Sequence, residues 1–109
     1  MSINLNSSPE EIINQLSPTE KQILYILGKL DISIKKNINE NTIKKKLSDN
    51  HLKKFPKSLN NLKNSGLIVK YRNNNWGVSK KGREVTHLIV KQRHDKYYKN
   101  LNRILLILD

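Results

Sequence analysis

The sequence predicts a mainly α-helical chain with one small β-hairpin and a long helix at its C-terminal end. Three patterns support this fold class. Apolar residues recur at three- and four-residue spacing within residues 9–30 and 55–62, which is typical of amphipathic helices. Two short β-prone runs surround an asparagine-rich segment within residues 67–78, as in a hairpin. Helical spacing then returns from residue 80 onward.

Two short motifs mark helix starts near the N-terminus. SPEE at residues 8–11 and SPTE at residues 17–20 each place a capping serine before a proline and a glutamate three positions after the serine. The first motif opens a short helix that ends near Leu16. The second opens the most apolar helix of the domain, running to Leu30. Gly28 weakens that helix slightly, which indicates a close helix crossing.

The segment that follows is less regular. Residues 31–36 alternate between apolar and polar side chains, which predicts a short edge strand either near residues 32–34 or at Ile38. Asn39 is a suitable N-cap for the next helix, which we expect to run through Leu47.

A second helix of the same pair contains Phe55, Leu59 and Leu62 at spacings that place them on one buried face. Pro56 restricts the residue before it to extended geometry, so we expect this helix to begin only at about Phe55, after a turn. Gly66 ends the helix, because glycine enters the left-handed conformation without steric cost.

The hairpin follows at once. Residues 67–71 favour a strand, residues 72–75 form a polar turn in which asparagine tolerates positive φ, and residues 76–78 return as the second strand. Ser79 caps a helix that we expect to run to the end of the chain. At 109 residues the chain is long enough for one domain and too short for two.

Basic residues are concentrated outside the N-terminal third. The chain holds 21 Lys and Arg against 9 acids, a net charge of +12. Residues 1–34 contain two lysines against four acids, whereas residues 35–103 contain 19 basic residues against four acids. A genome-wide lysine bias would raise lysine in the first part too, so we interpret the excess as functional. It indicates an extended polyanion as partner, either nucleic acid or an anionic membrane surface.

Several function classes are disfavoured. The chain has no cysteine, which excludes disulfides and thiolate metal sites. The N-terminus lacks the basic start and apolar run of a secretory signal, and the longest apolar run, residues 104–108, is far short of a membrane span. No basic helix also has a large apolar face, which disfavours the membrane surface. We therefore expect a cytoplasmic, nucleoid-associated protein.

Residues with other chemistry favour structural roles. Trp76 and Tyr71 are interpreted as core residues that pin the hairpin rather than as stacking platforms. His87 and His94 lie on one helix face without a nearby acidic or cysteine ligand, so no metal site is expected. The acids are too scattered for a carboxylate pair or a nucleophile–base pairing, so we expect neither an enzyme nor a cofactor.

Three motifs in order carry a resemblance to a known group of domains. They are LSPTE at residues 16–20, LNNLKNSGLI at residues 59–68 and WGVSKKGREV at residues 76–85. This order resembles the winged helix-turn-helix domains of small bacterial and archaeal transcription regulators, the MarR-like and PadR-like families among them. The resemblance covers residues 16–90. It implies DNA binding, with residues 55–65 as the recognition helix and residues 70–76 as the wing, and no particular signal.

On this interpretation the recognition helix presents lysine and asparagine opposite its apolar face. Asparagine pairs with adenine in the major groove, and lysine reaches guanine acceptors or phosphate. Lysines on the neighbouring helices are expected to contact phosphates, and the wing suits the backbone or a minor groove. An ordinary solvated face is the competing interpretation. The expected DNA-binding residues are Lys44, Lys45, Lys53, Lys54, Lys57, Ser58, Asn60, Asn61, Asn64, Lys70, Arg72, Asn74, Lys80 and Lys81.

The C-terminal end carries a second apolar stripe. It consists of Tyr97, Leu101, Ile104, Leu105 and Leu108. On a straight helix this stripe lies far from the body of the domain, so pairing with a second copy is the expected way to cover it. The predicted divisions are residues 1–16 as leader and short helix, residues 17–90 as the winged domain, and residues 91–109 as a dimerisation helix.

The predicted function is therefore a dimeric double-stranded DNA-binding protein, either a sequence-specific transcription regulator or an architectural protein. Two alternatives remain open. One is a winged-helix protein–protein adaptor in a transcription or replication assembly, with the lysines incidental. The other is a protein that binds structured RNA through the same basic face.

Overall fold

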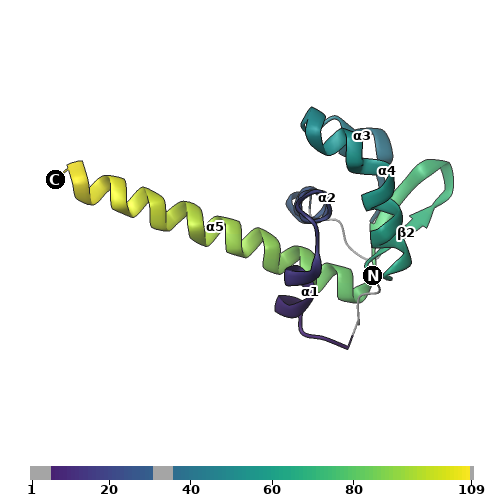
Figure 1. Cartoon of the computed structure of the whole chain (residues 1–109), viewed down its shortest axis with the longest axis horizontal. Coiled ribbons are helices and arrows are strands. Elements are labelled where there is room, and N and C mark those ends of the chain that lie inside the picture. Colours follow the sequence, from purple (N-terminus) through teal and green to yellow (C-terminus); the bar gives the residue numbers. More distant parts are fainter. Residues whose placement is uncertain (1–5, 31–35, 109) are drawn as a thin grey trace.

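The computed structural model describes residues 6–30 and 36–108, and the side chains within these ranges as far as Tyr97. It is mainly helical with a small three-stranded antiparallel sheet, as the sequence predicts (Figure 1). The described elements are α1 (Pro9–Gln15), α2 (Pro18–Lys29), β1 (Ile38–Asn39), α3 (Glu40–Lys44), α4 (Asp49–Asn64), β2 (Ile68–Tyr71), the 3-10 turn η1 (Arg72–Asn74), β3 (Asn75–Val78) and α5 (Lys80–Leu108).

The helix starts predicted at Ser8 and Ser17 are confirmed. The Ser8 hydroxyl accepts a hydrogen bond from the Glu11 backbone N–H at 3.3 Å. At Ser17 the capping box is complete, because its hydroxyl accepts from the Glu20 N–H at 3.2 Å and its own N–H donates to Glu20 Oε1 at 2.8 Å. These bonds satisfy N–H groups that a helix start would otherwise leave unpaired.

The boundaries predicted for α3 and α4 are wrong. Helix α3 ends at Lys44 rather than Leu47, because the next residues form a tight turn in which the Leu47 N–H donates to the Lys44 carbonyl at 3.1 Å. Helix α4 begins at Asp49 rather than near Phe55 and passes through Pro56 without stopping. Pro56 is exposed, so the helix accommodates it on its solvent side.

The sheet has the strand order β1-β3-β2, with both pairs antiparallel. Ile38 pairs with Trp76, so the prediction of a strand at Ile38 is confirmed; the alternative at residues 32–34 lies outside the described residues. The turn between β2 and β3 places Asn73 and Asn74 at φ of 60° and 58°, as the asparagine-rich sequence predicts. We refer to β2, η1 and β3 together as the hairpin.

One apolar core joins the helices to the sheet. The faces predicted to point inward on α1, α2, α4 and the start of α5 are buried, and Trp76 is only 4% exposed. The buried apolar residues are Ile12, Ile13, Leu16, Ile23, Leu24, Ile26, Leu27, Ile43, Leu47, Phe55, Leu59, Leu62, Leu67, Ile68, Trp76, Val78, Val85 and Ile89.

Tyr71 differs from the prediction, because it is 38% exposed instead of buried. Its ring nevertheless braces the hairpin from outside. A Cβ added at Gly77 would lie 2.8 Å from Tyr71 Cε2, so the ring covers the glycine directly on the neighbouring strand.

Two glycines allow close contacts between elements. A Cβ at Gly82 would lie 1.8 Å from the Leu67 carbonyl oxygen, so the first turn of α5 packs directly on the backbone where the hairpin begins. The same carbonyl accepts from the Ser79 N–H at 3.1 Å. A Cβ at Gly28 would lie 2.7 Å from Val90 Cγ2, which confirms the predicted close crossing, here between α2 and α5.

Helix α5 leaves the body of the domain after packing against α1 and α2, and its C-terminal half projects away from the other elements (Figure 1). Arg93 marks the end of the packed part. Its Nη1 donates to Gln22 Oε1 at 2.8 Å, and its guanidinium lies 4.1 Å from the centre of the Tyr25 ring. Burial lowers the pKa of the Arg93 guanidinium, against a smaller raising effect of Tyr25. None of the described helices has the length and apolar character needed to cross a membrane.

Candidate nucleic-acid interface

The outward face of α4 is a straight row of polar side chains. Lys53, Lys57, Asn60 and Asn64 follow one another at spacings of four, three and four residues, which places them on one ridge of the helix. All four are exposed. We call these four residues the α4 ridge. Four of the residues predicted to contact DNA therefore do share one accessible surface.

Ser58 does not belong to that surface, which corrects the prediction. It is 6% exposed and lies on the inward side of α4. The reason is its spacing: Ser58 follows Phe55 by three residues and precedes Leu62 by four, so all three occupy one helix face. The base edges of a duplex lying on the α4 ridge would not reach it.

One side of α4 faces the junction of α1 and α2. There Lys53, Lys54, Lys57 and Asn61 line a hollow of about 590 Å³, opposite the start of α2. We call this side the α2-side flank. A hydrogen bond of 2.9 Å between Thr19 Oγ1 and His51 Nδ1 ties the first turns of α2 and α4 together and keeps the flank in place.

The other side of α4 faces the hairpin, which lies beside it at the end of the molecule opposite the tip of α5 (Figure 1). We call it the hairpin-side flank. A hollow of about 230 Å³ lies here, walled by apolar side chains of the core and rimmed by polar ones. Of the predicted residues it brings together Lys44, Asn60 and Lys70.

Sequence reasoning missed Lys63 on this flank. It lines the same hollow, and it follows Asn60 by three residues and Pro56 by seven. That spacing places it on the helix side next to the ridge, so a closer reading of the periodicity finds it. Asn61, by contrast, lines the hollow on the α2-side flank, away from the hairpin.

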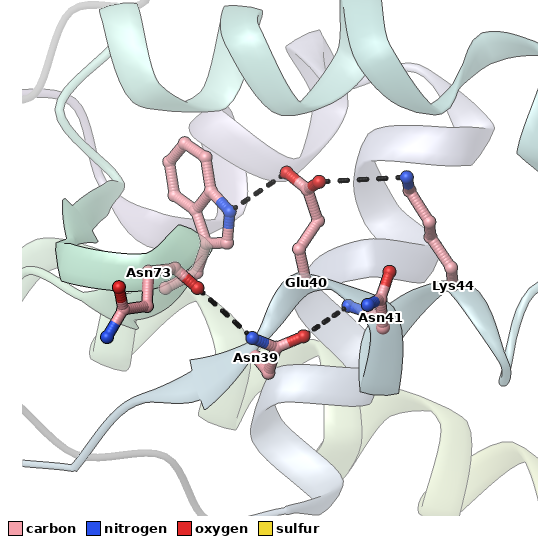
Figure 2. A network of polar contacts seen from close by, with 6 residues as sticks. Asn39, Glu40, Asn41, Lys44 and Asn73 are labelled. Carbon is pink, nitrogen blue, oxygen red and sulfur yellow. Dashed lines mark hydrogen bonds and ion pairs between the residues drawn. The ribbon is translucent and has the colours of Figure 1, made fainter.

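Two lysines of the hairpin-side flank already have partners. Lys44 Nζ lies 3.6 Å from Glu40 Oε2 and 5.6 Å from the centre of the Phe55 ring. Lys70 Nζ lies 5.9 Å from the centre of the Trp76 ring. Glu40 also accepts a hydrogen bond from Trp76 Nε1 at 3.2 Å (Figure 2). These lysines are positioned by the fold and are therefore less free to move toward a ligand.

A polar network fixes the tip of the hairpin against the start of α3. Asn39 Nδ2 donates to the Asn73 carbonyl at 3.1 Å, and Asn39 Oδ1 accepts from the Asn41 N–H at 2.9 Å (Figure 2). Asn39 Nδ2 also donates to Asn75 Oδ1 at 3.2 Å. One side chain thus caps α3 and holds the turn that presents Arg72. The hairpin is a supported arm, not a free loop.

The other predicted contact residues line neither hollow. Lys45, Arg72, Asn74 and Lys80 are exposed, whereas Lys81 pairs with Glu84 at 3.4 Å. Between residues 36 and 83 the chain has thirteen Lys and Arg against only Glu40 and Asp49. Because Glu40 is occupied by Lys44 and Trp76, the surface around α4 and the hairpin carries a strong excess of positive charge.

The predicted dimerisation stripe is described only in part. Tyr97 is 63% exposed. The side chains of Leu101, Ile104, Leu105 and Leu108 lie outside the described ones, although the backbone that carries them is helical.

In residues 6–30 and 36–97 no group of three His, Asp or Glu is arranged to hold a metal ion. The chain was also compared with known proteins. It matches no family model, and neither curated proteins nor solved structures include a significant match. The inference of function therefore depends on the geometry of the site.

Proposed function

We propose that this chain binds double-stranded DNA as a winged helix-turn-helix protein, with α4 in the major groove and the hairpin as the wing. One observation carries the proposal. The α4 ridge and the supported hairpin lie side by side, within a stretch of the chain, residues 36–83, that holds thirteen basic residues against two acids. A helix and a neighbouring strand pair of this charge suit the groove and the flanking phosphates of a duplex.

The proposed contact residues divide into those that contact base edges and those that contact phosphates. Asn60, Asn64 and Lys57 on the ridge suit base edges, because asparagine pairs with adenine and lysine reaches guanine acceptors. Lys45, Lys54 and the tip residue Arg72 suit phosphates, for which charge within reach is sufficient. At about 1.5 Å per residue, the sixteen residues of α4 span about 24 Å, which is long enough for the ridge to lie along a groove.

The proposal includes a dimer. In the sequence, Leu101, Ile104, Leu105 and Leu108 continue a helical stripe on the half of α5 that projects beyond the body. Two copies pairing along this stripe would hold two α4 helices at a fixed separation, and thereby fix the spacing of two half-sites. Replacing Leu101 and Ile104 by aspartate is expected to give monomers in light scattering, with weaker DNA binding. Variants that remain dimers would reject the pairing.

The test of DNA binding is a fluorescence-anisotropy titration of a labelled duplex, repeated over a range of salt concentrations. We expect binding at low salt that weakens steeply as salt rises, because each neutralised phosphate releases counterions. The same titration with a structured RNA separates the two nucleic acids. No duplex binding at low salt would overturn the proposal. A monomer without affinity for either nucleic acid would instead indicate a protein–protein adaptor.

A further inference from the structure

The α2-side flank contains a feature that duplex binding along the α4 ridge does not require. Its hollow is lined by Lys53, Lys54, Lys57 and Asn61 from α4 and by residues 15–17 with Glu20 from the α1–α2 junction. At about 590 Å³, it lies within the range of roughly 300–1,000 Å³ that small-molecule sites occupy. It is therefore a concave site of ligand size with a basic wall.

Ser58 contributes a hydroxyl donor to the lining of this hollow. It lines this hollow and is 94% buried, being 6% exposed. Within the described part of the chain its hydroxyl makes no hydrogen bond. Among the described residues, every side-chain oxygen that is inaccessible to solvent has a hydrogen-bond partner. The unpartnered Ser58 hydroxyl is therefore accessible to solvent, and it opens into the hollow. Because the hydroxyl is accessible from the hollow, it is available to donate to an anion that binds there in place of solvent.

The chemistry of the lining favours a phosphate group. Three lysines and the single carboxylate of Glu20 line the hollow, which gives it a charge excess of two, equal in size to the charge of a phosphate dianion. Glu20 is 7% exposed and its Oε1 is occupied by the Ser17 N–H. The Ser58 hydroxyl and the Asn61 amide add neutral donors. Together these donors exceed what the two oxygens of a carboxylate accept, and they suit the oxygens of a phosphate.

We propose that this hollow is a phosphate-binding site formed by Lys54, Ser58 and Asn61 together with Lys53 and Lys57. The phosphate comes either from a DNA backbone that flanks the occupied groove or from a small phosphorylated compound. Because Lys53 and Lys57 also belong to the α4 ridge, a small compound bound here would weaken duplex binding. The proposal itself needs no DNA, so it stands or fails separately from the proposed function.

The test is a titration of the ¹⁵N-labelled protein with sodium pyrophosphate, followed by the backbone amides in two-dimensional NMR spectra. We expect saturable shifts at residues 16–20 and 54–61. Lys54→Gln should weaken the affinity about fivefold, whereas Lys91→Gln, the same charge change on the exposed side of α5, should leave it within twofold. Ser58→Ala should weaken it about threefold with an unchanged melting temperature, because no hydrogen bond is lost.

Shifts that do not saturate would overturn the proposal. An equal loss of pyrophosphate affinity in Lys54→Gln and Lys91→Gln would overturn it too, since either result indicates a general attraction to positive charge. Absence of shifts would overturn it too. A second arm identifies the source of the phosphate. If duplex DNA shifts the same amides and pyrophosphate displaces it, the backbone supplies the phosphate. If the duplex leaves residues 16–20 unshifted while pyrophosphate moves them, the source is a small phosphorylated compound.

Discussion

The two flanks of α4 both carry lysines, but they hold them differently. On the hairpin-side flank, Lys44 pairs with Glu40 and lies over Phe55, and Lys70 lies over Trp76. On the α2-side flank, the three lysines have no ion pair among the described residues and surround a hollow instead. A count of lysines therefore does not locate an anion site, because the partners that each lysine already has must be considered first.

The flanks also depend on different anchors, and the largest expected effect concerns the hairpin side. Gly82→Ala would place a Cβ 1.8 Å from the Leu67 carbonyl oxygen, and neither backbone can yield easily. We expect it to lower the free energy of unfolding by about 3 kcal/mol, measured by urea denaturation. Gly77→Ala is the matched control, because its new Cβ would meet the half-exposed ring of Tyr71, which can move.

The control is expected to cost about 1 kcal/mol or less. Equal losses for Gly82→Ala and Gly77→Ala would show that the backbone contact between Leu67 and α5 is not the anchor of the hairpin.

A smaller effect is expected from the polar network at the tip. Asn39→Ala removes the cap of α3 and both bonds to the turn, so we expect a loss of about 1–2 kcal/mol in the free energy of unfolding. The hairpin tip should lose its support at the same time. Hydrogen exchange in Asn39→Ala, compared with the parent protein, should be accelerated more at residues 73–75 than at residues 53–61. Unchanged exchange at the tip would mean that the strands alone hold the turn.

The smallest expected effect on stability is accompanied by a gain in duplex affinity. Glu40→Gln keeps an acceptor for Trp76 Nε1 but removes the charge that holds Lys44. The free energy of unfolding should change by less than about 0.5 kcal/mol, because the ion pair is partly exposed. Duplex affinity should rise about twofold, since the surface loses a negative charge. Glu10→Gln, an exposed change on α1, controls for net charge. Equal gains in duplex affinity for Glu40→Gln and Glu10→Gln would show that release of Lys44 does not contribute to binding.

Features set by neighbouring residues could be predicted from the sequence. The capping serines at 8 and 17, the left-handed Gly66 and the asparagine turn all depend on bonds within four residues or on local φ, and the structure confirms each. The inward faces of the helices also follow from spacing alone.

Features that depend on distant partners could not be predicted. Pro56 locally favours a later start of α4. The hydrogen bond between Thr19 and His51, which lie 32 residues apart in the sequence, helps to hold the first turns of the helix in place. The occupation of Lys44 likewise depends on the positions of Glu40 and Phe55 in the folded chain.

The two flanks of α4 could likewise be assigned only from the packing of the helix against other elements. Ser58 is polar, yet its spacing places it on the face that Phe55 and Leu62 bury; only the packing of α4 near the α1–α2 junction shows that a hollow lies beside it. That packing turns Asn61 toward α2 and leaves Lys63 beside the hairpin. Spacing defined the ridge between them, whereas the hollows on either side required the tertiary structure.

The most direct test of the account compares two double variants of equal charge in duplex binding. Lys53→Gln with Lys57→Gln removes two cations of the α4 ridge, and Lys91→Gln with Lys96→Gln removes two exposed cations of α5. We predict that the ridge variant loses at least about tenfold in affinity and lowers the slope of log Kd against log salt by about two, while the α5 variant changes affinity by less than about threefold. Equal losses in both variants would contradict the account, because the duplex would then respond to net charge and not to the surface of α4.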